Sequence, residues 1–366
     1  MNKITTLFVL ILFSTITFAQ CNGRYQTEIF SSVTKTTVNY SDVYNDNEHE
    51  MDIYTPDGDI EINRPVILYM HGGSFYGGNK TLTDCVDFCE SMAKRGYVTA
   101  SLNYRLTNVL TFLSSQAEQY KIVLKSVADA KAAVRYFRKD HAINANTYGI
   151  DPSTIFAGGY SSGGVIAIHM AFIDAISDLP TAPIDVQDLV NTIGGNLEGD
   201  AGNVGYSSDV QGVISVAGGI NDVNWIDGND EPLVSIQGTD DLTVNYYCGP
   251  GTNNPLVLDL CGSGEMHPRA DNVGLLNDKL IFNGTDHLWA AYGNSNSKFT
   301  QALEFTKDFL YPLLPCNNAT SISSVNSEKI LIKITDLLGR ETEKTINTPL
   351  FYIYSNGEVE KKIFIN

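Results

Sequence analysis

From about residue 21 to residue 315, the chain alternates short, continuously apolar runs with longer amphipathic ones. The expected strands are 65–71, 97–104, 154–158, 210–217, 233–237 and 279–282. The expected helices are 82–95, 118–139, 162–176 and 298–310. Continuously apolar strands that alternate with helices indicate a mostly parallel sheet covered on both faces. We therefore expect an α/β domain over 21–315 that binds ligands at the carboxyl ends of its strands.

Two segments depart from this pattern. Residues 178–209 are rich in Gly, Asn and Asp and are too long for an ordinary loop, so they form either a lid facing the substrate or a solvated excursion. Residues 316–325 are polar and predict a linker. Residues 326–366 alternate apolar and polar positions between turn signals, which predicts a small domain of short antiparallel strands.

The first twenty residues predict a secretory signal peptide rather than part of the fold. Lys3 precedes an apolar run that begins near Leu7 and ends near Ala19. This run is shorter than the roughly 20 residues that a membrane span needs. A lipoprotein signal is the alternative, because Cys21 follows directly. We expect export and no transmembrane span in the mature protein.

Cysteine usage agrees with export, because oxidising compartments tolerate disulfides. Cys248 and Cys261 bracket a short Gly/Pro/Asn-rich stretch and are the favoured disulfide pair. The alternative is that several of the six cysteines are free, buried thiols. No Cys/His spacing predicts a zinc site.

Charge excludes two classes of partner. The chain has 366 residues and a net charge of −18, which argues against nucleic acid and against docking on anionic lipid. Residues 326–366 carry six basic and six acidic side chains, so the negative charge belongs to the larger domain. Residues 221–231 are acidic but lack the spacing of an EF-hand, so we expect a solvated loop and no metal ligand.

A GxSxG motif supplies the first candidate for chemistry. Gly159-Tyr160-Ser161-Ser162-Gly163 follows the expected strand 154–158 and precedes a helix-like run. This strand–turn–helix placement is typical of a nucleophile elbow, in which Ser161 would be the nucleophile. The alternative is a Gly/Ser turn without chemistry.

A serine hydroxyl needs a base, and the base needs an orienting acid. On this fold the acid and then the histidine should follow the serine in chain order. His287 lies just after the strand 279–282, whereas His267 is a competitor predicted to lie in a loop. Asp240 and Asp241 both follow the strand 233–237.

Asp286 ranks below these two carboxylates as the orienting acid. It precedes His287 directly, and neighbouring side chains rarely face each other. The sequence leaves the choice between Asp240 and Asp241 open.

The developing oxyanion needs backbone N–H donors. His71-Gly72-Gly73-Ser74 follows the strand 65–71 at its carboxyl end, and glycines there allow the backbone to approach a ligand closely. We expect the N–H groups of Gly73 and Ser162 to form the oxyanion hole, with Gly72 next. The alternative is a flexible loop.

Six motifs occur in one order: HGGSF, NYRL, DAKAAVRYFRKD, YGIDPSTIFAGGYSSGG, GTDDLTV and TDH. Over roughly 45–315 the chain therefore resembles the α/β-hydrolase carboxylesterases with an HGG-type oxyanion loop. The resemblance implies a nucleophile at Ser161, a base at His287 and no cofactor. It favours Asp241 as the acid, because the family pattern reads Gly-Thr-x-Asp-x-x-Val, and it makes His71 a loop-shaping residue. The chain departs from many relatives at Ser74, where they have a third glycine.

The tail carries a second resemblance. ITDLLGRE followed by NTPLFYIYSNGEVEKKIFIN resembles the C-terminal sorting domain of the type IX secretion system of Bacteroidetes-type bacteria. The resemblance implies the type IX machinery as a partner and passage through the outer membrane. The tail would then be removed or would attach the protein to the cell surface.

Together these patterns predict a secreted or surface-attached serine ester hydrolase that works through an acyl-enzyme. Acetyl or feruloyl esters of polysaccharide are possible substrates, as are lipid-like, polyester and small soluble esters. Aromatic side chains could line an acyl pocket or belong to the half-buried core: Tyr160, Tyr246, Tyr247 and Trp289. The alternatives are a serine peptidase of the same fold and a catalytically silent surface binding protein.

Overall fold

The computed structural model describes residues 21, 23–316, 331–336, 340, 342, 350–354 and 359–362. These residues separate into two compact units at the boundary between 317 and 318. The predicted signal peptide, and all of the predicted linker except Cys316, lie outside the described residues. Within the described part of the chain, no helix is both long enough and apolar enough to cross a bilayer.

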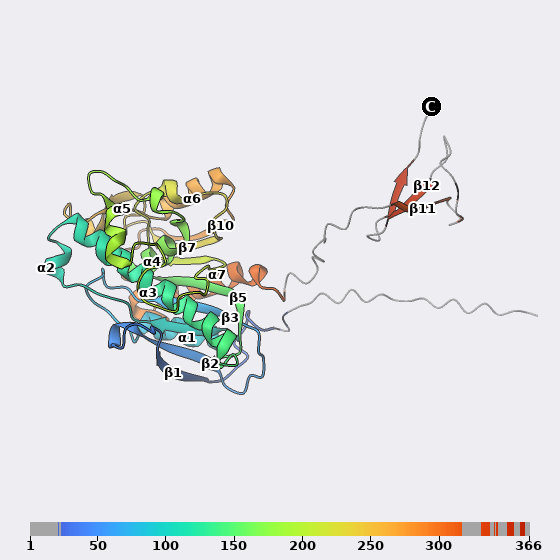
Figure 1. The fold of residues 1–366 in the computed structure, drawn as a ribbon, viewed down its shortest axis with the longest axis horizontal. Helices are drawn as coiled ribbons and strands as arrows, with labels where there is room; N and C mark the ends of the chain where they lie inside the picture. The colour runs from blue at the N-terminus through green and yellow to red at the C-terminus, as the bar shows by residue number, and fades with distance from the viewer. Residues whose placement is uncertain are drawn as a thin grey trace, which may run out of the picture. The chain divides into compact units, whose positions relative to one another are not determined.

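The larger unit is built on an eight-stranded sheet (Figure 1). Its strands are β1 (Val33–Asn39), β2 (Glu50–Pro56), β3 (Arg64–Met70), β4 (Val98–Leu102), β5 (Ile150–Tyr160), β6 (Val213–Val216), β7 (Leu233–Gly238) and β10 (Asn277–Phe282). They lie in the order β1-β2-β4-β3-β5-β6-β7-β10. The pairs β1–β2 and β2–β4 are antiparallel, and every other pair is parallel. The sequence prediction of a mostly parallel sheet is confirmed.

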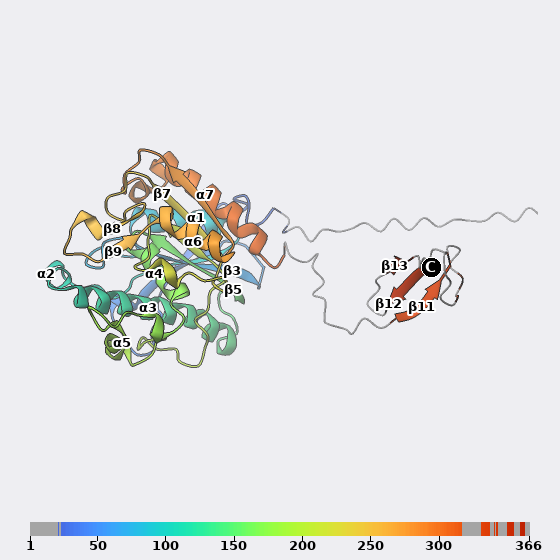
Figure 2. The ribbon, with the colours of Figure 1, turned by 90° about the horizontal axis from the view of Figure 1, so that it is seen from above.

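Helices cover both faces of this sheet (Figure 2). They are α1 (Thr83–Lys94), α2 (Val109–Phe112), α3 (Gln116–Ile143), α4 (Ser162–Phe172), α5 (Val186–Leu189), α6 (Ser263–Val273) and α7 (Ser297–Leu310). Successive side chains of a strand point to opposite faces. Accordingly, Leu68 of β3 packs in the same core as α3 and α4, whereas Ile67 packs in the core of α1 and α7.

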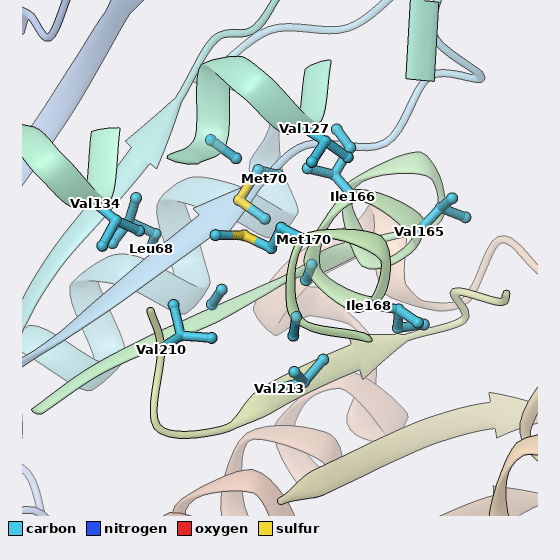
Figure 3. Packing of buried hydrophobic residues seen from close by; sticks show 14 of the residues in the cluster. Leu68, Met70, Val127, Val134, Val165, Ile166, Ile168, Met170, Val210 and Val213 are labelled. Carbon is cyan, nitrogen blue, oxygen red and sulfur yellow. The ribbon is translucent and has the colours of Figure 1, made fainter. Parts of the chain in front are cut away.

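Buried side chains of β3, α3 and α4 pack together in one core. Figure 3 shows this packing, with Leu68, Met70, Val127, Val134, Ile166 and Met170 among its labelled side chains. All but Val127 and Met170 are fully buried. Burying a side chain of this size stabilises the fold by roughly 1.5–3 kcal/mol. The carboxyl ends of β3 and β5 are therefore held rigidly.

Several boundaries differ from the predicted ones. Strand β5 begins at Ile150, four residues before the predicted start at 154, and α4 ends at Phe172, before the predicted end at 176. Helix α3 begins after Ser115, whose hydroxyl caps it by accepting the Glu118 N–H. The prediction of a loop around His267 was wrong, because α6 continues through Pro268. Strands β1 and β2 were missed because they add an antiparallel edge that breaks the strand–helix alternation.

Residues 178–209 form short helical turns that pack against α3. Val186 and Val190 are buried in the core shared with α3, and Arg135 of α3 contacts Glu198 at 2.7 Å. No residue of this fully described segment lines the cleft that contains Ser161. In this structure the segment covers α3, which fits neither the predicted lid nor a solvated excursion.

The smaller unit contains a three-stranded sheet in its described residues. Strands β11 (Leu331–Thr335), β12 (Leu350–Tyr354) and β13 (Val359–Lys362) lie in that order and pair antiparallel. The prediction of short antiparallel strands in the tail is confirmed for these residues.

Two disulfides constrain the larger unit. The Cys248–Cys261 pair, which the sequence favoured, joins β8 (Cys248–Pro250) to β9 (Asp259–Cys261). The second bond joins Cys21 to Cys316 across 295 residues of chain. Cys85 and Cys89 remain free and buried in α1.

The long-range disulfide is expected to contribute strongly to stability. Cross-linking restricts the unfolded chain, and the effect grows with loop length. We predict that Cys316→Ser lowers the free energy of unfolding by about 3–5 kcal/mol, measured by urea unfolding without reductant. The difference should shrink when both proteins are measured in reductant. Equal midpoints without reductant would contradict this prediction.

Candidate active site

Ser161 occupies a strained turn between β5 and α4. Its φ of 56° and ψ of −119° are unusual for a residue other than glycine. The turn requires small neighbours, because a Cβ atom on Gly159 or Gly163 would overlap the backbone carbonyl of Met70. The geometry is that of a nucleophile elbow, with the serine at the carboxyl end of a central parallel strand.

Three side chains that follow three parallel strands form one hydrogen-bonded chain. His287 Nε2 lies 2.8 Å from Ser161 Oγ, and His287 Nδ1 lies 2.7 Å from Asp241 Oδ2. Ser161 follows β5, Asp241 follows β7 and His287 follows β10. With Nδ1–H donating to the carboxylate, Nε2 can accept the serine hydroxyl proton. The structure thus brings together the three residues that the sequence proposed.

The carboxylate of Asp241 is fixed on both oxygens. Its side chain is fully buried, and Oδ1 accepts the N–H groups of Thr243 and Val244 at 2.9 Å each. Asp240 and Asp286 are exposed, and neither carboxylate forms a hydrogen bond with the imidazole of His287. The geometry therefore selects Asp241 of the two carboxylates that the sequence left open.

Tyr160 also contacts His287, through its ring and through its hydroxyl group. Its ring stacks on the imidazole of His287 with centroids 5.1 Å apart. Its hydroxyl donates to the backbone carbonyl of His287 at 3.0 Å. Tyr160 is the last residue of β5 and directly precedes Ser161. The end of β5 therefore positions both Ser161 and the imidazole of His287. Of the four aromatics that the sequence flagged, Tyr160 lines the cleft; Tyr246, Tyr247 and Trp289 do not.

His267 belongs to a separate buried cluster. Its Nε2 lies 2.5 Å from Ser235 Oγ, and its Nδ1 lies 2.6 Å from Asn277 Oδ1. Burial lowers the pKa of His267, and Asn277 partly offsets that effect. The hydrogen bond to Ser235 on β7 keeps it inside the protein, so it does not serve Ser161.

His71 shapes the loop after β3. Its Nδ1–H donates to the carbonyl of Gly72 at 2.7 Å, and its ring stacks on Tyr104 at 4.3 Å. Burial lowers its pKa to about 4, so the ring is neutral near pH 7. The Tyr104 hydroxyl donates to the His71 carbonyl at 2.7 Å and lies 3.2 Å from Ser162 Oγ. These contacts link the loop to the elbow.

The loop after β3 presents backbone to the serine. Gly72 and Gly73 line the same cleft as Ser161, and Gly73 has a φ of 135°, which a side chain would strain. The Gly73 carbonyl accepts the N–H groups of Tyr76 and Gly77, which closes the turn. Within the described chain, the N–H groups of Gly73 and Ser162 have no hydrogen-bond acceptor. Neither amide is used within the described residues, and Gly73 lies in the lining of the cleft.

The cleft around Ser161 has a volume of about 500 Å³, within the range of small-molecule sites. Half-exposed apolar side chains line it: Tyr76, Leu82 and Leu288. Two polar residues of the lining, Thr83 and Asp84 on the first turn of α1, were not among the candidates that the sequence offered. In the sequence these two positions look like the start of an ordinary helix, so no local pattern predicted that they line the cleft.

Three carboxylates elsewhere could hold a cation. Oxygens of Asp174, Asp227 and Asp230 lie within 4.8 Å of one another. Burial, then the neighbouring Asp227, raises the pKa of Asp230 to about 7. Acidic side chains often gather without an ion, so the cluster alone does not define a metal site, and the expectation of no metal stays a prediction.

The fold is that of the α/β-hydrolases, and the hydrogen-bonded chain of Ser161, His287 and Asp241 has the geometry of a serine hydrolase triad. The family model BD-FAE matches residues 51–220, which hold the loop after β3 and the elbow. Among curated proteins, the para-nitrobenzyl esterase of Bacillus subtilis (strain 168) is 33% identical over 119 residues. That match covers 31% of this chain and 22% of the relative, so the chain spans about a fifth of its length.

Solved structures of two esterases share the fold. A truncated form of a carbohydrate esterase from gut microbiota aligns with a TM-score of 0.56 and 19% identity, covering 78% of this chain and 97% of that one. Esterase 2 of Thermogutta terrifontis, phosphorylated by paraoxon, aligns with a TM-score of 0.54 and 20% identity, covering 76% and 94%. At these identities the likeness establishes the α/β-hydrolase fold.

Proposed function

We propose that this protein hydrolyses carboxylic esters of carbohydrates through an acyl-enzyme, with Ser161 as nucleophile. One observation carries the proposal: the Asp241–His287–Ser161 hydrogen-bonded chain opens into a cleft beside two amides without acceptors. A nucleophile, a base with its orienting acid and an oxyanion site are the parts that acyl transfer needs.

The proposed reaction proceeds in two halves. His287 Nε2 takes the hydroxyl proton as Ser161 Oγ attacks the ester carbonyl carbon. The N–H groups of Gly73 and Ser162 donate to the oxyanion, and the buried Asp241 carboxylate stabilises the imidazolium. His287 then donates the proton to the leaving alcohol. Water, activated by the same imidazole, hydrolyses the acyl-enzyme and restores Ser161.

The substrate class rests on the relatives and on the cleft. The BD-FAE match and the fold of the gut carbohydrate esterase favour a carbohydrate ester. The open cleft with apolar Tyr76, Leu82 and Leu288 offers contact area for a short acyl or an aromatic acyl group. Acetyl and feruloyl esters of polysaccharide fit this description.

We also propose that the protein is exported to the cell surface or beyond. Two disulfides support the proposal, because such bonds persist in oxidising compartments. The leader-like residues 1–20 and the sorting-domain resemblance of 326–366 supply the route, through an inner-membrane signal and then the type IX machinery.

A panel of esters tests the proposed activity. We expect hydrolysis of 4-nitrophenyl acetate and of acetylated xylan or methyl ferulate, with rates falling as straight acyl chains lengthen. Faster turnover of long-chain esters would favour a lipid-type or polyester substrate instead. Hydrolysis of peptide amides without any ester hydrolysis would favour the peptidase. No turnover of any substrate would favour a binding protein.

A further inference from the structure

Asp84 is an acidic side chain of the active-site cleft to which the proposed mechanism assigns no role. It lies on the first turn of α1 and lines the same cleft as Ser161 and His287. Only 2% of the residue is exposed. A carboxyl group this buried usually has a charged or strongly hydrogen-bonded partner.

The described residues provide no cation for this carboxyl group. None of the ion pairs among them includes Asp84, and the side chain within hydrogen-bond distance is Cys85, whose Sγ lies 3.7 Å from Oδ2. A thiol is a weak donor. Burial raises the pKa of Asp84 to about 7, although hydrogen bonds from the Cys85 thiol and from backbone N–H groups of Asp84 and Cys85 lower it, so protonated and ionised forms coexist near neutral pH.

The residues that line the rest of the cleft include no second carboxylate. Gly77 and Gly78 contribute backbone, Leu82, Leu288 and Ala291 contribute carbon surface, and Thr83 and Thr243 are neutral hydroxyl-bearing residues of the same lining. A carboxyl group among mostly apolar lining side chains can fix one polar group of a ligand, and Asp84 is the one carboxylate in this lining. In its neutral form the carboxyl can donate a hydrogen bond, and in either form it can accept one.

We propose that Asp84 binds a hydroxyl group of the ester substrate and makes the enzyme prefer hydroxyl-bearing esters. The inference rests on the proposed function and names the chemistry that its substrate must carry. A sugar hydroxyl beside the ester and a phenolic hydroxyl on the acyl group both supply this chemistry. Asp84 would then determine specificity without taking part in bond making or breaking.

A purely structural role makes a different prediction. An acidic side chain in the first turn also stabilises a helix through its dipole. Losing that role would lower stability, or lower the rates with all esters alike. A change in the ratio of rates between matched substrates reports contact with the substrate.

The test compares pairs of esters that differ by one hydroxyl. In one pair, a monoacetylated methyl xyloside is set against its analogue lacking the neighbouring hydroxyl. In the other, methyl ferulate is set against methyl 3-methoxycinnamate, which lacks only the phenolic hydroxyl. We expect the wild-type enzyme to favour the hydroxyl-bearing member of at least one pair by about tenfold or more in kcat/KM. The pair that discriminates identifies the source of the hydroxyl.

Variants connect the preference to Asp84. Asp84→Ala should reduce the ratio to within about twofold of one, and Asp84→Asn should keep part of it, because an amide still forms hydrogen bonds. Asp87→Asn is the matched control: it removes a carboxylate from the same helix, and Asp87 does not line the cleft. The control should keep the wild-type ratio. Asp84→Leu replaces Asp84→Ala if circular dichroism shows that the alanine variant is unfolded.

Failure of this inference can be told apart from failure of the proposed function. Wild-type ratios near one in both pairs, or a full ratio retained without the Asp84 carboxyl, would overturn the inference while ester hydrolysis stands. No hydrolysis of either pair or of 4-nitrophenyl acetate would overturn the proposed function and the inference with it.

Discussion

Replacing Ser161 with alanine is expected to lower kcat for 4-nitrophenyl acetate by at least about 10⁴-fold, since the attacking oxygen is lost. The fold should survive, because the methyl group fits where Cβ already lies and the backbone strain at this position stays the same. Binding of the ester should change little, since the amides of Gly73 and Ser162 remain. Steady-state kinetics and thermal unfolding of the variant measure both expectations.

Ser235→Ala is the matched control for this loss. Ser235 also has a histidine partner, His267, yet it is buried inside the sheet and lies outside the cleft. The control removes an equivalent hydroxyl and should leave kcat within about threefold, because surrounding structure absorbs most single changes away from the site. Comparable losses in both variants would mean that the assignment of Ser161 is wrong.

Asp241→Asn is expected to lower kcat by about 10³–10⁴-fold with a small change in KM. The carboxylate holds the Nδ1 proton of His287 and stabilises the imidazolium that forms during attack. An amide of the same shape can present its NH₂ group to the ring, which favours the tautomer with its proton on Nε2. That tautomer cannot accept the proton of Ser161. The loss should appear as a fall in kcat across the full range of pH.

Asp240→Asn separates this effect from a change in local charge. It removes the same charge one residue earlier, from an exposed side chain that forms no hydrogen bond with the imidazole of His287. We expect less than a threefold change, because exposed charges are screened by solvent. Equal losses at the two positions would contradict the geometric selection of Asp241.

The parts of the site that follow parallel strands were predictable from sequence. Ser161, Asp241 and His287 come directly after apolar runs, and parallel strands bring such ends to one edge of a sheet. Local residue types therefore specified which segments meet. The choice between Asp240 and Asp241 needed either the family resemblance or the structure, because both follow the same strand.

Other features depend on packing that no local pattern encodes. Asp84 lines the cleft because the fold brings the first turn of α1 to the same cleft as Gly77 and Gly78. The Cys21–Cys316 bond joins positions 295 residues apart, and several pairings were compatible with the sequence. Residues 178–209 were expected to be a lid or a solvated excursion because most of them are polar. The few buried valines that pack on α3 do not form a pattern that the sequence reveals.

Covalent trapping tests the central claim most directly. The mature protein would be treated with a 4-nitrophenyl alkylphosphonate, digested and examined by peptide mass spectrometry. We predict one phosphonyl group on Ser161, stoichiometric loss of esterase activity, and no labelling in Ser161→Ala. Labelling at another serine together with loss of activity, or full activity after complete labelling of Ser161, would contradict the account.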